Sequence, residues 1–217
     1  MNLTELQTHL HDCQRCGLSA GRTQVVFGTG NPQASIMFVG EAPGFYEDQQ
    51  GVPFIGAAGK LLTKLLESVG LSREDIYIAN VVKCRPPNNR DPQPDEIDTC
   101  KPFLLQQIQI IKPKLVCSLG NFATHVLLGR KVGITKVRGQ TFHLPEFILF
   151  PLLHPAAALH QGNLLVPLRE DFQKLKGVLE SMNSTNQSPG QDEIVTTAET
   201  TQEPPQSPPS PTQMDLF

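Results

Sequence analysis

The stretch that decides the fold is "SIMFVGEAPG", residues 35–44, in which an apolar run ends abruptly in a glycine, an acid and a Pro-Gly turn. A short, uninterrupted apolar run bounded by turn residues is typical of a strand buried on both faces. Three later stretches have the same character, at residues 75–84, 113–120 and 146–155. The sequence therefore predicts four buried strands, the first of which lies in 35–44.

The stretches before, between and after these strands have apolar residues at helical spacing. They cover residues 3–10, 57–70, 92–112, 121–129 and 164–182. Strands that alternate with helices along a chain are typical of a parallel sheet covered by helices on both faces. We therefore predict an α/β protein with a three-layer αβα fold and a central, mainly parallel, four-stranded sheet. In such a sheet, ligands bind beyond the carboxyl ends of the strands.

The composition of the chain changes near Asn183. From there to residue 217 the sequence is rich in Pro, Ser, Thr and Gln, with five acidic residues and no Lys or Arg. Such a sequence cannot bury enough apolar surface to offset the entropy lost on folding. We therefore predict a folded domain over 1–182, a disordered linker over 183–212 and a distinct peptide at 213–217. The formal charge of −3 divides into about +2 for the domain and −5 for the tail, which is compatible with nucleic-acid binding without demonstrating it.

Long apolar runs and secretion signals are missing from the sequence. No run of about 18 apolar residues is present, and residues 1–16 do not pair a positively charged region with an apolar one. We therefore expect no membrane span and a cytoplasmic protein. Because disulfides rarely persist in the cytosol, the five cysteines are not expected to form a disulfide framework.

Four of the five cysteines have the spacing of a metal site. Cys13 and Cys16 form a C-x2-C pair, and Cys84 and Cys100 lie on either side of a Pro-rich stretch. Four thiolates suit either zinc or an iron–sulfur cluster. Zinc sites more often use two short C-x2-C pairs, so the wide second spacing favours a cluster over zinc, and both zinc and four unrelated free thiols stay open as alternatives. Cys117 lies inside a predicted strand and is expected to be a small core residue.

Polar side chains occur where three of the predicted strands end. Glu41 follows the first strand, Asn80 interrupts the second and His154 follows the fourth. We expect these ends to converge on one edge of the sheet, which favours a functional site there. His154 could donate a hydrogen bond to a developing anion, or it could cap a following helix. The Asn80 amide could bind the edge of a planar heterocycle, or it could bond a neighbouring turn.

The segment after the first strand adds an aromatic ring and a second carboxylate. Phe54 is either a stacking platform for a ligand or a core residue. Glu41 and Glu47 suggest a carboxylate pair for acid–base chemistry, although a carboxylate can equally hold backbone N–H groups in a tight turn. The "GTG" at 28–30 is too short to be a nucleotide fingerprint, and no P-loop motif is present.

With these features in place, the sequence closely resembles the family 4, iron–sulfur, uracil-DNA glycosylases over about residues 1–182. The resemblance rests on the four cysteines at the family spacing and on an ordered series of motifs, "VVFGTGNP", "IMFVGEAPG", "PFIGAAGKLL", "YIANVVKCRPPNNRDP", "EIDTC", "RGQ" and "HPAA". The related family 5 enzymes usually have an apolar residue at the position of Glu41, so the glutamate favours family 4.

The resemblance implies a monofunctional enzyme that removes uracil from DNA and leaves an abasic site. The target nucleotide leaves the helix to reach the pocket, and uracil opposite guanine is already weakly paired. It also implies a 4Fe–4S cluster with a structural role, held by Cys13, Cys16, Cys84 and Cys100. The expected partner is DNA that contains uracil, and we expect the protein to be a monomer.

The resemblance also implies a surface that binds the flipped base. Phe54 stacks on the uracil, and Asn80 hydrogen-bonds its Watson–Crick edge. Cytosine in the same place leaves donors and acceptors unmatched, which is unfavourable in a buried site. Gly40, Ala42 and Gly44 belong to the same surface, where small residues let the backbone come close to the base.

The catalytic set implied by the resemblance is His154, Glu41 and Glu47. His154 stabilises negative charge on uracil O2 as the N-glycosidic bond breaks, Glu41 organises the loop after the first strand, and Glu47 rejects the methyl group of thymine. Most glycosidases use two carboxylates across the bond that breaks. Some other uracil-DNA glycosylases have an Asp at the position of Ala42, which this chain lacks. The reaction is therefore expected to depend on leaving-group stabilisation and a positioned water, whose holder the sequence does not identify.

DNA contacts are implied outside the pocket. Leu159, in the predicted 154–161 loop, is a candidate wedge that enters the space vacated in the DNA. The family commonly has an Arg at the position of His160, so a phosphate contact there does not carry over. Three basic residues near the cluster are candidate phosphate contacts, with a solvated loop as the alternative: Lys83, Arg85 and Arg90.

The last five residues, "QMDLF" at 213–217, recover apolar character. Q-x-x-L-F at the end of a disordered tail resembles the peptide by which bacterial DNA-repair and replication proteins bind the sliding clamp. Gln213 would occupy a polar niche, and Leu216 and Phe217 an apolar pocket. Such a tether raises the local concentration of the enzyme near the clamp. A chance match is the alternative, because short motifs are common.

Two other functional classes stay open: a non-catalytic iron–sulfur protein that binds nucleic acid, and a redox protein that uses its cluster for electron transfer. A redox protein does not need polar and aromatic residues at three strand ends. A binding module would lack a base-sized pocket among them. A pocket at this edge of the sheet is therefore the feature that separates the enzyme from both alternatives.

Overall fold

The computed structural model describes residues 1–185. The last helix continues to Thr185, so the first residues of the segment predicted as a linker are helical. The rest of that segment lies outside the described residues, as does the predicted clamp-binding peptide at 213–217.

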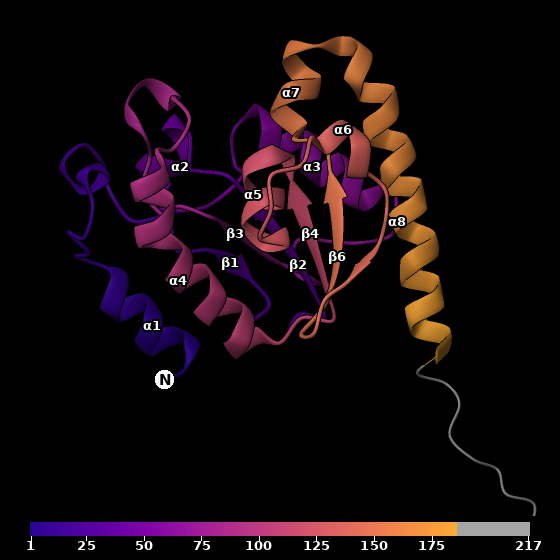
Figure 1. Ribbon diagram of the computed structural model, residues 1–217, viewed down its shortest axis with the longest axis horizontal. Coiled ribbons are helices and arrows are strands. Elements are labelled where there is room, and N and C mark those ends of the chain that lie inside the picture. Colours follow the sequence, from indigo (N-terminus) through magenta and orange to yellow (C-terminus); the bar gives the residue numbers. More distant parts are fainter. Residues whose placement is uncertain (186–217) are drawn as a thin grey trace, which may run out of the picture.

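One mixed sheet forms the centre of the fold (Figure 1). Its four central strands are parallel and are the four that the sequence predicts: β3 (Tyr77–Asn80), β2 (Ile36–Gly40), β4 (Leu115–Leu119) and β6 (Ile148–Leu152). A two-residue strand pairs antiparallel at each edge, β1 (Thr29–Gly30) beside β3 and β5 (Phe142–His143) beside β6. The prediction of four strands in total is therefore wrong. The described sheet has six, because two residues are too few to show a strand pattern in a sequence.

Helices cover both faces of this sheet (Figure 1). They are α1 (Leu3–Leu10), α2 (Phe45–Gln50), α3 (Ala57–Glu67), α4 (Pro94–Ile111), α5 (Gly120–Leu128), α6 (Ile134–Val137), α7 (Pro155–His160) and α8 (Leu165–Thr185), joined by 3-10 turns at Gly17–Ala20, Pro87–Asn89 and Gly162–Leu164. Helices α1, α4 and α5 pack on one face, and α3, α6 and α8 on the other. The three-layer αβα prediction is confirmed. None of the described helices is long and apolar enough to cross a membrane.

The burial of β2 explains why its sequence is an uninterrupted apolar run. Successive side chains of a strand point to opposite faces of the sheet. Met37 and Val39 belong to the core beneath α1, α4 and α5, whereas Ile36 and Phe38 belong to the core beneath α3 and α8. Both faces of the strand are covered, so all its residues are buried.

Two short helices follow strand ends and are absent from the sequence predictions. Helix α2 follows β2, and α7 follows β6. The prediction of a loop over 154–161 is therefore wrong for most of that segment. Each helix has six residues, which are too few to show a helical period in a sequence. In Figure 1, α7 lies above the ends of β4 and β6.

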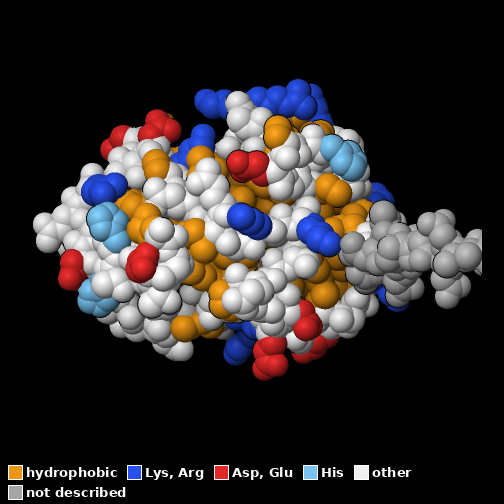
Figure 2. Space-filling model, turned by 90° about the horizontal axis from the view of Figure 1, so that it is seen from below, with side chains coloured by type: hydrophobic (Ala, Val, Ile, Leu, Met, Phe, Trp, Pro, Cys, Tyr) orange, Lys and Arg blue, Asp and Glu red, His pale blue; other side chains and the backbone are white. Residues whose placement is uncertain are grey.

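The carboxyl ends of the central strands meet at one edge of the sheet. Gly40 pairs in register with Asn80, and Leu119 pairs with Leu152. Figure 2 shows the molecule from below in the view of Figure 1, the side facing away from this edge. Lys and Arg side chains gather along the upper edge of this view, and elsewhere on the face acidic and basic side chains are scattered among hydrophobic ones.

Candidate active site

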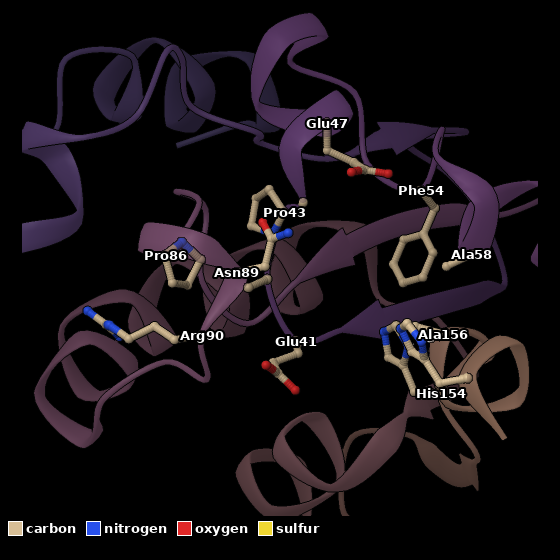
Figure 3. Close-up of a pocket in the computed structure, with 13 residues that line it drawn as sticks. Glu41, Pro43, Glu47, Phe54, Ala58, Pro86, Asn89, Arg90, His154 and Ala156 are labelled. Atoms are coloured by element: carbon tan, nitrogen blue, oxygen red, sulfur yellow. Dashed lines mark hydrogen bonds between the residues drawn. The ribbon is translucent and has the colours of Figure 1, made fainter.

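A cavity of about 340 Å³ opens at the carboxyl ends of the central strands (Figure 3). This volume is in the range of small-molecule sites. Six residues assigned to the base-binding and catalytic site from the sequence line it: Glu41, Ala42, Gly44, Glu47, Phe54 and His154. The rest of the lining consists of Pro43, Ala58, Pro86, Asn89, Arg90, Ala156 and His160.

Gly40 and Asn80 meet Phe54 at the edge of this cavity. A Cβ atom on Gly40 would clash with Asn80 Oδ1 and would stand 2.6 Å from the Phe54 ring, so only glycine fits there. Asn80 is buried, and its Oδ1 atom has no hydrogen-bond partner within residues 1–185. A buried acceptor without a partner is unfavourable unless a ligand supplies the donor. The Asn80 amide is therefore a candidate ligand-binding group next to an aromatic ring.

Phe54 has an unusual backbone conformation that fixes its ring. Its φ of 54° lies in the left-handed region, which is rare for an aromatic residue. Arg73 donates a hydrogen bond to the Phe54 carbonyl. A Cβ on Gly59 would clash with that carbonyl oxygen, so glycine is required there too. These contacts hold Phe54 both in the core and at the cavity wall, which combines the two interpretations drawn from the sequence.

Glu47 supports the same turn from the other side. Its Oε1 atom accepts hydrogen bonds from the backbone N–H groups of Ile55, at 3.0 Å, and of Gly56, at 2.9 Å. The carboxylate therefore holds backbone N–H groups, which was the alternative to an acid–base role. Its Oε2 atom lies against Gly44, where an added Cβ would stand 2.8 Å away. Figure 3 shows the Glu47 carboxylate at the cavity above Phe54.

His154 is the N-cap of α7, as one of the two sequence interpretations expects. Its Nδ1 atom accepts a hydrogen bond from the Ala156 N–H at 3.1 Å, which leaves Nε2 as the protonated nitrogen of a neutral ring. Burial lowers the pKa of His154 to about 4, because the charged form is poorly solvated. The ring lies 5.7 Å from the Phe54 ring, tilted by 31°. At neutral pH, His154 is therefore an oriented, uncharged hydrogen-bond donor.

Gly120 makes room for this histidine. It has a φ of +86°, and a Cβ there would stand 3.1 Å from His154 Cβ. The turn from β4 into α5 therefore requires glycine both for its backbone conformation and for its closeness to His154.

Glu41 lies in the same cavity but in a different environment from Glu47. Burial, together with the smaller effect of the nearby charge of Asp91, raises the pKa of Glu41 to about 7. In Figure 3 its carboxylate points away from Glu47 and Phe54, into the part of the cavity between Arg90 and His154. A carboxyl group with this pKa can gain or lose a proton near neutral pH.

The four cysteines assigned to a metal site line one small cavity. Cys13 and Cys16 follow α1, Cys84 follows β3 and Cys100 lies in α4. Arg22 and Lys83 line the same cavity. Cys117 is fully buried in the core on the other side of the sheet, as predicted.

Hydrogen bonds to sulfur support a cluster of thiolates in this cavity. Arg22 donates from Nη1 to Cys84 Sγ at 3.4 Å, and the Lys83 backbone N–H donates to Cys100 Sγ at 3.3 Å. Such donors stabilise the negative sulfurs of iron–sulfur clusters. Among residues 1–185, no three or more His, Cys, Asp and Glu side chains are arranged as a metal site. The donor set and its surroundings nevertheless fit a four-thiolate cluster.

Lys83 does not contact phosphate, and that prediction is wrong. Its side chain is 1% exposed. The Nζ atom donates to the Asn80 backbone carbonyl at 2.8 Å and to Gln107 Oε1 at 2.5 Å. The residue continues the buried strand β3 into the cysteine cavity, so solvent cannot reach it. Lys83 therefore connects Asn80 to the cysteine cavity, which sequence reasoning did not anticipate.

Asn89 and Arg90 line the cavity and belong to the chain segment between Cys84 and Cys100. Arg90 makes two hydrogen bonds to the buried Glu96 carboxylate, at 2.9 and 2.7 Å. Asn89 accepts from Arg85 Nε at 2.8 Å and has a φ of 54°, a left-handed conformation that asparagine adopts readily. The "PPNN" stretch could have indicated this turn from the sequence, but not its place in the cavity wall.

The candidate DNA wedge lies outside the cavity lining. Leu159 is 50% exposed on α7, and the next residue, His160, lines the cavity. The candidate clamp-binding residues, Gln213, Leu216 and Phe217, lie outside the described residues.

Comparisons with known proteins agree with this arrangement. Residues 27–176 match the family model "Uracil DNA glycosylase superfamily". The chain is 49% identical to the "Type-4 uracil-DNA glycosylase" of Sulfurisphaera tokodaii, over 81% of this chain and 84% of that protein. It is 47% identical to proteins of the same name from Saccharolobus solfataricus, over 83% of this chain and 88% of that one, and from Thermotoga maritima, over 77% and 89%. The chain therefore belongs to the uracil-DNA glycosylase superfamily and, within it, to the type-4 family.

Proposed function

We propose that this protein is a DNA-repair enzyme that hydrolyses the N-glycosidic bond of uracil in DNA and leaves an abasic site. The observation that carries the proposal is the unpartnered Oδ1 of Asn80 beside the fixed ring of Phe54. Uracil has a flat ring with an N–H donor next to carbonyl acceptors on one edge. Phe54 stacks on that ring, and Asn80 Oδ1 accepts from the uracil N3–H group. The base must leave the helix to enter a pocket of this kind.

The leaving base gains negative charge as the bond breaks. The bond between uracil N1 and the sugar C1′ breaks with its electron pair remaining on the base, and a water oxygen bonds to C1′. The Nε2–H group of His154 donates to uracil O2, where part of the charge accumulates. Because the ring is neutral and already oriented by Ala156, it needs no rearrangement during the reaction.

Glu41 is the carboxyl group best suited to take the water proton. Its pKa of about 7 leaves a substantial fraction ionised at neutral pH and makes it a stronger base than an ordinary carboxylate. This role goes beyond the loop-organising role that the resemblance implies. The residue after Glu41 is Ala42, which has no ionisable group. Glu41 is therefore the carboxyl group that stands directly at the end of β2.

Discrimination against other bases depends on groups around the pocket. Cytosine has an acceptor in place of the uracil N3–H group, so it would leave Asn80 Oδ1 facing another acceptor. We assign to Glu47 the exclusion of thymine, because its Oε2 atom lies against Gly44 beside the pocket. A methyl group in that place would meet a carboxylate that two backbone N–H groups hold in position.

The proposal includes a structural 4Fe–4S cluster bound by Cys13, Cys16, Cys84 and Cys100. When bound, the cluster supplies a cross-link between the region after α1 and the segment from 84 to 100. Pro86, Asn89 and Arg90 belong to this segment and line the active-site cavity. The cluster would therefore hold one wall of the cavity in place, and hydrolysis of the glycosidic bond requires no electron transfer through it.

Contacts with the rest of the DNA complete the proposal. Leu159 is exposed on α7 at the edge of the cavity region and is the candidate wedge that fills the space left by the flipped base. Arg85 and Arg90 remain the candidate phosphate contacts. We further infer that the protein acts as a monomer and that Gln213, Leu216 and Phe217 bind a sliding clamp. Loss of binding to a purified bacterial clamp in Phe217→Ala would test that inference.

The proposed activity is tested with the cluster-loaded full chain and a labelled duplex that contains one U·G pair. Alkali cleaves the strand at an abasic site, so we expect cleavage of the uracil strand and none with T·G or C·G pairs. Asn80→Ala should lower kcat/KM strongly, because the base loses its hydrogen-bond partner. Ser181→Ala, on the exposed part of α8, serves as a control for handling and expression.

Two results would overturn the proposal. One is an absence of cleavage by protein that carries its full complement of iron. The other is equal cleavage of all three duplexes, which would show that the pocket does not select uracil. In the first case, retained binding of the duplex would favour the non-catalytic nucleic-acid-binding alternative, and a reversible redox change of the cluster with a partner would favour the electron-transfer protein.

A further inference from the structure

Three acidic side chains are buried in the described part of the chain, and one of them has no basic partner. Glu96 is 4% exposed and Asp171 is fully buried, and each forms an ion pair with an arginine. Asp48 is 2% exposed, yet none of the ion pairs within residues 1–185 includes it. A carboxylate that is buried without a cation needs other hydrogen-bond donors.

The backbone of a distant segment supplies the donor for Asp48. The Thr23 N–H group donates to both carboxylate oxygens of Asp48, at 2.9 and 3.1 Å. Two side-chain hydrogen bonds join the same segment to α2. Gln49 Nε2 donates to Thr23 Oγ1 at 2.7 Å, and Gln24 Nε2 donates to the Gln49 carbonyl at 2.6 Å. We call these four residues, Thr23, Gln24, Asp48 and Gln49, the α2 anchor.

The segment that carries Thr23 also contacts the cysteine cavity. Arg22, the residue before Thr23, lines that cavity. Its Nη1 atom donates to Cys84 Sγ at 3.4 Å and to the Cys13 carbonyl at 2.5 Å. Residues 22–24 therefore contact the cysteine cavity through Arg22 and α2 through the next two residues.

Another side of α2 faces the active-site cavity. Glu47 precedes Asp48 and lines the cavity, and successive side chains on a helix point about 100° apart. Figure 3 shows the Glu47 carboxylate above Phe54. The same carboxylate accepts hydrogen bonds from the N–H groups of Ile55 and Gly56, in the turn after Phe54. A shift of α2 would therefore move both this carboxylate and the turn that carries the stacking ring.

We propose that Asp48 is a positioning residue that fixes α2 on residues 22–24 and thereby connects the cysteine cavity to the wall formed by Glu47 and Phe54. This inference rests on the proposed function, in which Glu47 excludes thymine. A rigid pocket distinguishes ligands that differ by one small apolar group by about 10- to 200-fold. A wall that can move away loses this selection, so the exclusion of thymine depends on Asp48.

The proposal implies that two walls of the active-site cavity depend on the cysteine cavity. The segment from 84 to 100 carries one wall, with Asn89 and Arg90. The α2 anchor carries the other, with Glu47. Loosening the anchor should therefore have two consequences that do not reduce to a general loss of stability. Selection against thymine should weaken, and iron should leave the cysteine cavity faster.

The first test compares two substitutions of Asp48 in the full-length, cluster-loaded protein. Asp48→Ala removes the acceptor for the Thr23 N–H group, whereas Asp48→Asn keeps one acceptor oxygen. The measurement is kcat/KM for duplexes with one U·G or one T·G pair. We expect Asp48→Ala to lower the ratio of uracil to thymine excision about 10-fold or more, chiefly because thymine is now excised. Asp48→Asn should stay within about 3-fold of wild type.

A control and a milder variant separate positioning from stability. Asp171→Asn also changes a buried acid, but Asp171 lies in α8 and lines neither cavity. We expect it to lower Tm and to leave the ratio unchanged. The double variant Gln24→Ala/Gln49→Ala removes two exposed hydrogen bonds of the anchor, so it should fold normally. It should change the ratio in the same direction as Asp48→Ala, by about 3-fold.

The second test needs no catalysis. Bathophenanthroline disulfonate, a chelator of ferrous iron, removes iron from the protein without DNA, and the visible absorbance reports the iron that remains. We expect iron release from Asp48→Ala to be about 5-fold faster than from wild type, because Arg22 is no longer held by its neighbour Thr23. Asp171→Asn should release iron at the wild-type rate.

The third test uses the reciprocity of coupling between two sites. The probe is a duplex with 2′-fluoro-2′-deoxyuridine opposite guanine, in which the fluorine opposes the positive charge that develops at C1′ and so prevents cleavage. A base held in the pocket should slow iron release from wild-type protein about 5-fold or more. Most of this protection should be absent in Asp48→Ala.

The possible results distinguish this inference from the proposed function. Iron release from Asp48→Ala and from the double variant at the wild-type rate would refute the connection, whether or not the protein excises uracil. If wild-type protein excises uracil, an unchanged ratio of uracil to thymine excision in both variants would refute the positioning role. Equal protection of wild type and Asp48→Ala by the probe duplex would also overturn it. A wild-type protein that excises no uracil contradicts the proposed function, and the iron-release rates then decide the connection alone.

Discussion

The active-site cavity and the cysteine cavity share one segment of chain but differ in how their polar groups are satisfied. The segment from Asn80 to Cys100 contributes to both. At the edge of the active-site cavity, the buried Oδ1 of Asn80 has no hydrogen-bond partner among the described residues. In the cysteine cavity, Cys84 and Cys100 each accept a hydrogen bond from a nitrogen. A buried acceptor without a partner suits a substrate that binds and is released. A sulfur that already accepts a hydrogen bond suits a permanently bound cofactor.

This difference predicts different consequences for mutations in the two cavities. Changes in the active-site cavity should lower the reaction rate with little effect on the free energy of unfolding. Changes in the cysteine cavity should lower the free energy of unfolding. Lys83 lines the cysteine cavity and connects it to Asn80, because its side chain donates to the Asn80 carbonyl while its backbone N–H donates to Cys100 Sγ. Four predictions test this division.

The largest effect on stability is expected for Cys100→Ser. A cluster would join Cys16 to Cys84 and thereby close a long loop, and a covalent cross-link over such a loop is worth about 4 kcal/mol in the chain-entropy account. We expect the variant to lose its iron and the visible absorbance of the cluster. Its Tm should fall by about 8–16 °C for a domain of this size. Iron analysis and thermal unfolding measure the two effects.

Cys117→Ala is the matched control for this change. Cys117 is equally a buried cysteine, but it lies in the core of β4, away from the cysteine cavity. We expect it to lose about 1 kcal/mol of packing energy and to retain all its iron. Equal iron content in the two variants would contradict the assignment of the cysteine cavity.

The next largest effect is expected for His154→Ala, and it should appear in the rate. Removing one preoriented donor to a developing anion typically lowers kcat by about 10²- to 10³-fold. Single-turnover excision of uracil from a U·G duplex measures this rate directly. The Tm should change by only a few degrees. His160→Ala is the comparison, because His160 lines the same cavity at the other end of α7; a loss as large as that of His154→Ala would contradict the role proposed for His154.

Lys83→Met should have a smaller effect than His154→Ala, and it should change both the activity and the properties of the cluster. The Asn80 carbonyl and Gln107 Oε1 lose their shared donor, so we expect kcat/KM for uracil to fall about 10-fold, or about 1.4 kcal/mol. A positive charge near a cluster stabilises its reduced form, which is the more negative one. Loss of the Lys83 charge should therefore lower the reduction potential of a bound cluster. Voltammetry of the cluster measures that shift. Lys101→Met, which changes a lysine in a different surface groove, should alter neither quantity appreciably.

Most of the fold could be predicted from the sequence because its central strands are largely apolar runs that are buried on both faces of the sheet. The four central strands and the long helices show clear apolar patterns. The edge strands β1 and β5 and the helices α2 and α7 could not be predicted, since two to six residues show no period. Sheet topology then explains why Asn80 and Gly40 meet, because the two residues pair in register.

The candidate site was predictable where strand ends determine it and unpredictable where long-range contacts do. Glu41 and His154 follow strands, so their place at one edge could be anticipated. The contact of Arg73 with the Phe54 carbonyl joins residues that are far apart in the sequence, and no local pattern indicates it. Lys83 illustrates the same limit: a lysine near a cysteine resembles a phosphate contact, and only the packing of β3 shows that it is buried.

The smallest effect expected is the pH dependence that Glu41 contributes to stability. Its pKa is about 7 in the folded protein and has an ordinary value of 4.5, so the folded state binds the proton more tightly. Stability should therefore fall as the pH rises from about 4.5 to 7 and stay level above that range. Glu41→Gln removes the titrating group. Since Glu41 is partly exposed, we expect the variant to be about 1 kcal/mol more stable than wild type at pH 8, and equally stable at pH 5.

Thermal unfolding at several pH values between 5 and 8 measures this difference. Asp91→Asn sharpens the test, because the charge of Asp91 raises the pKa of Glu41. Removal of the Asp91 charge should lower the upper end of the pH range over which stability falls, but the fall itself should remain. A Glu41→Gln variant that is less stable than wild type at pH 8 would mean that the ionised carboxylate has a stabilising partner. Glu41 would then have a hydrogen-bond or charge partner in the folded protein, as the sulfurs of the cysteine cavity do. The proposed difference between the two cavities would be wrong for this residue.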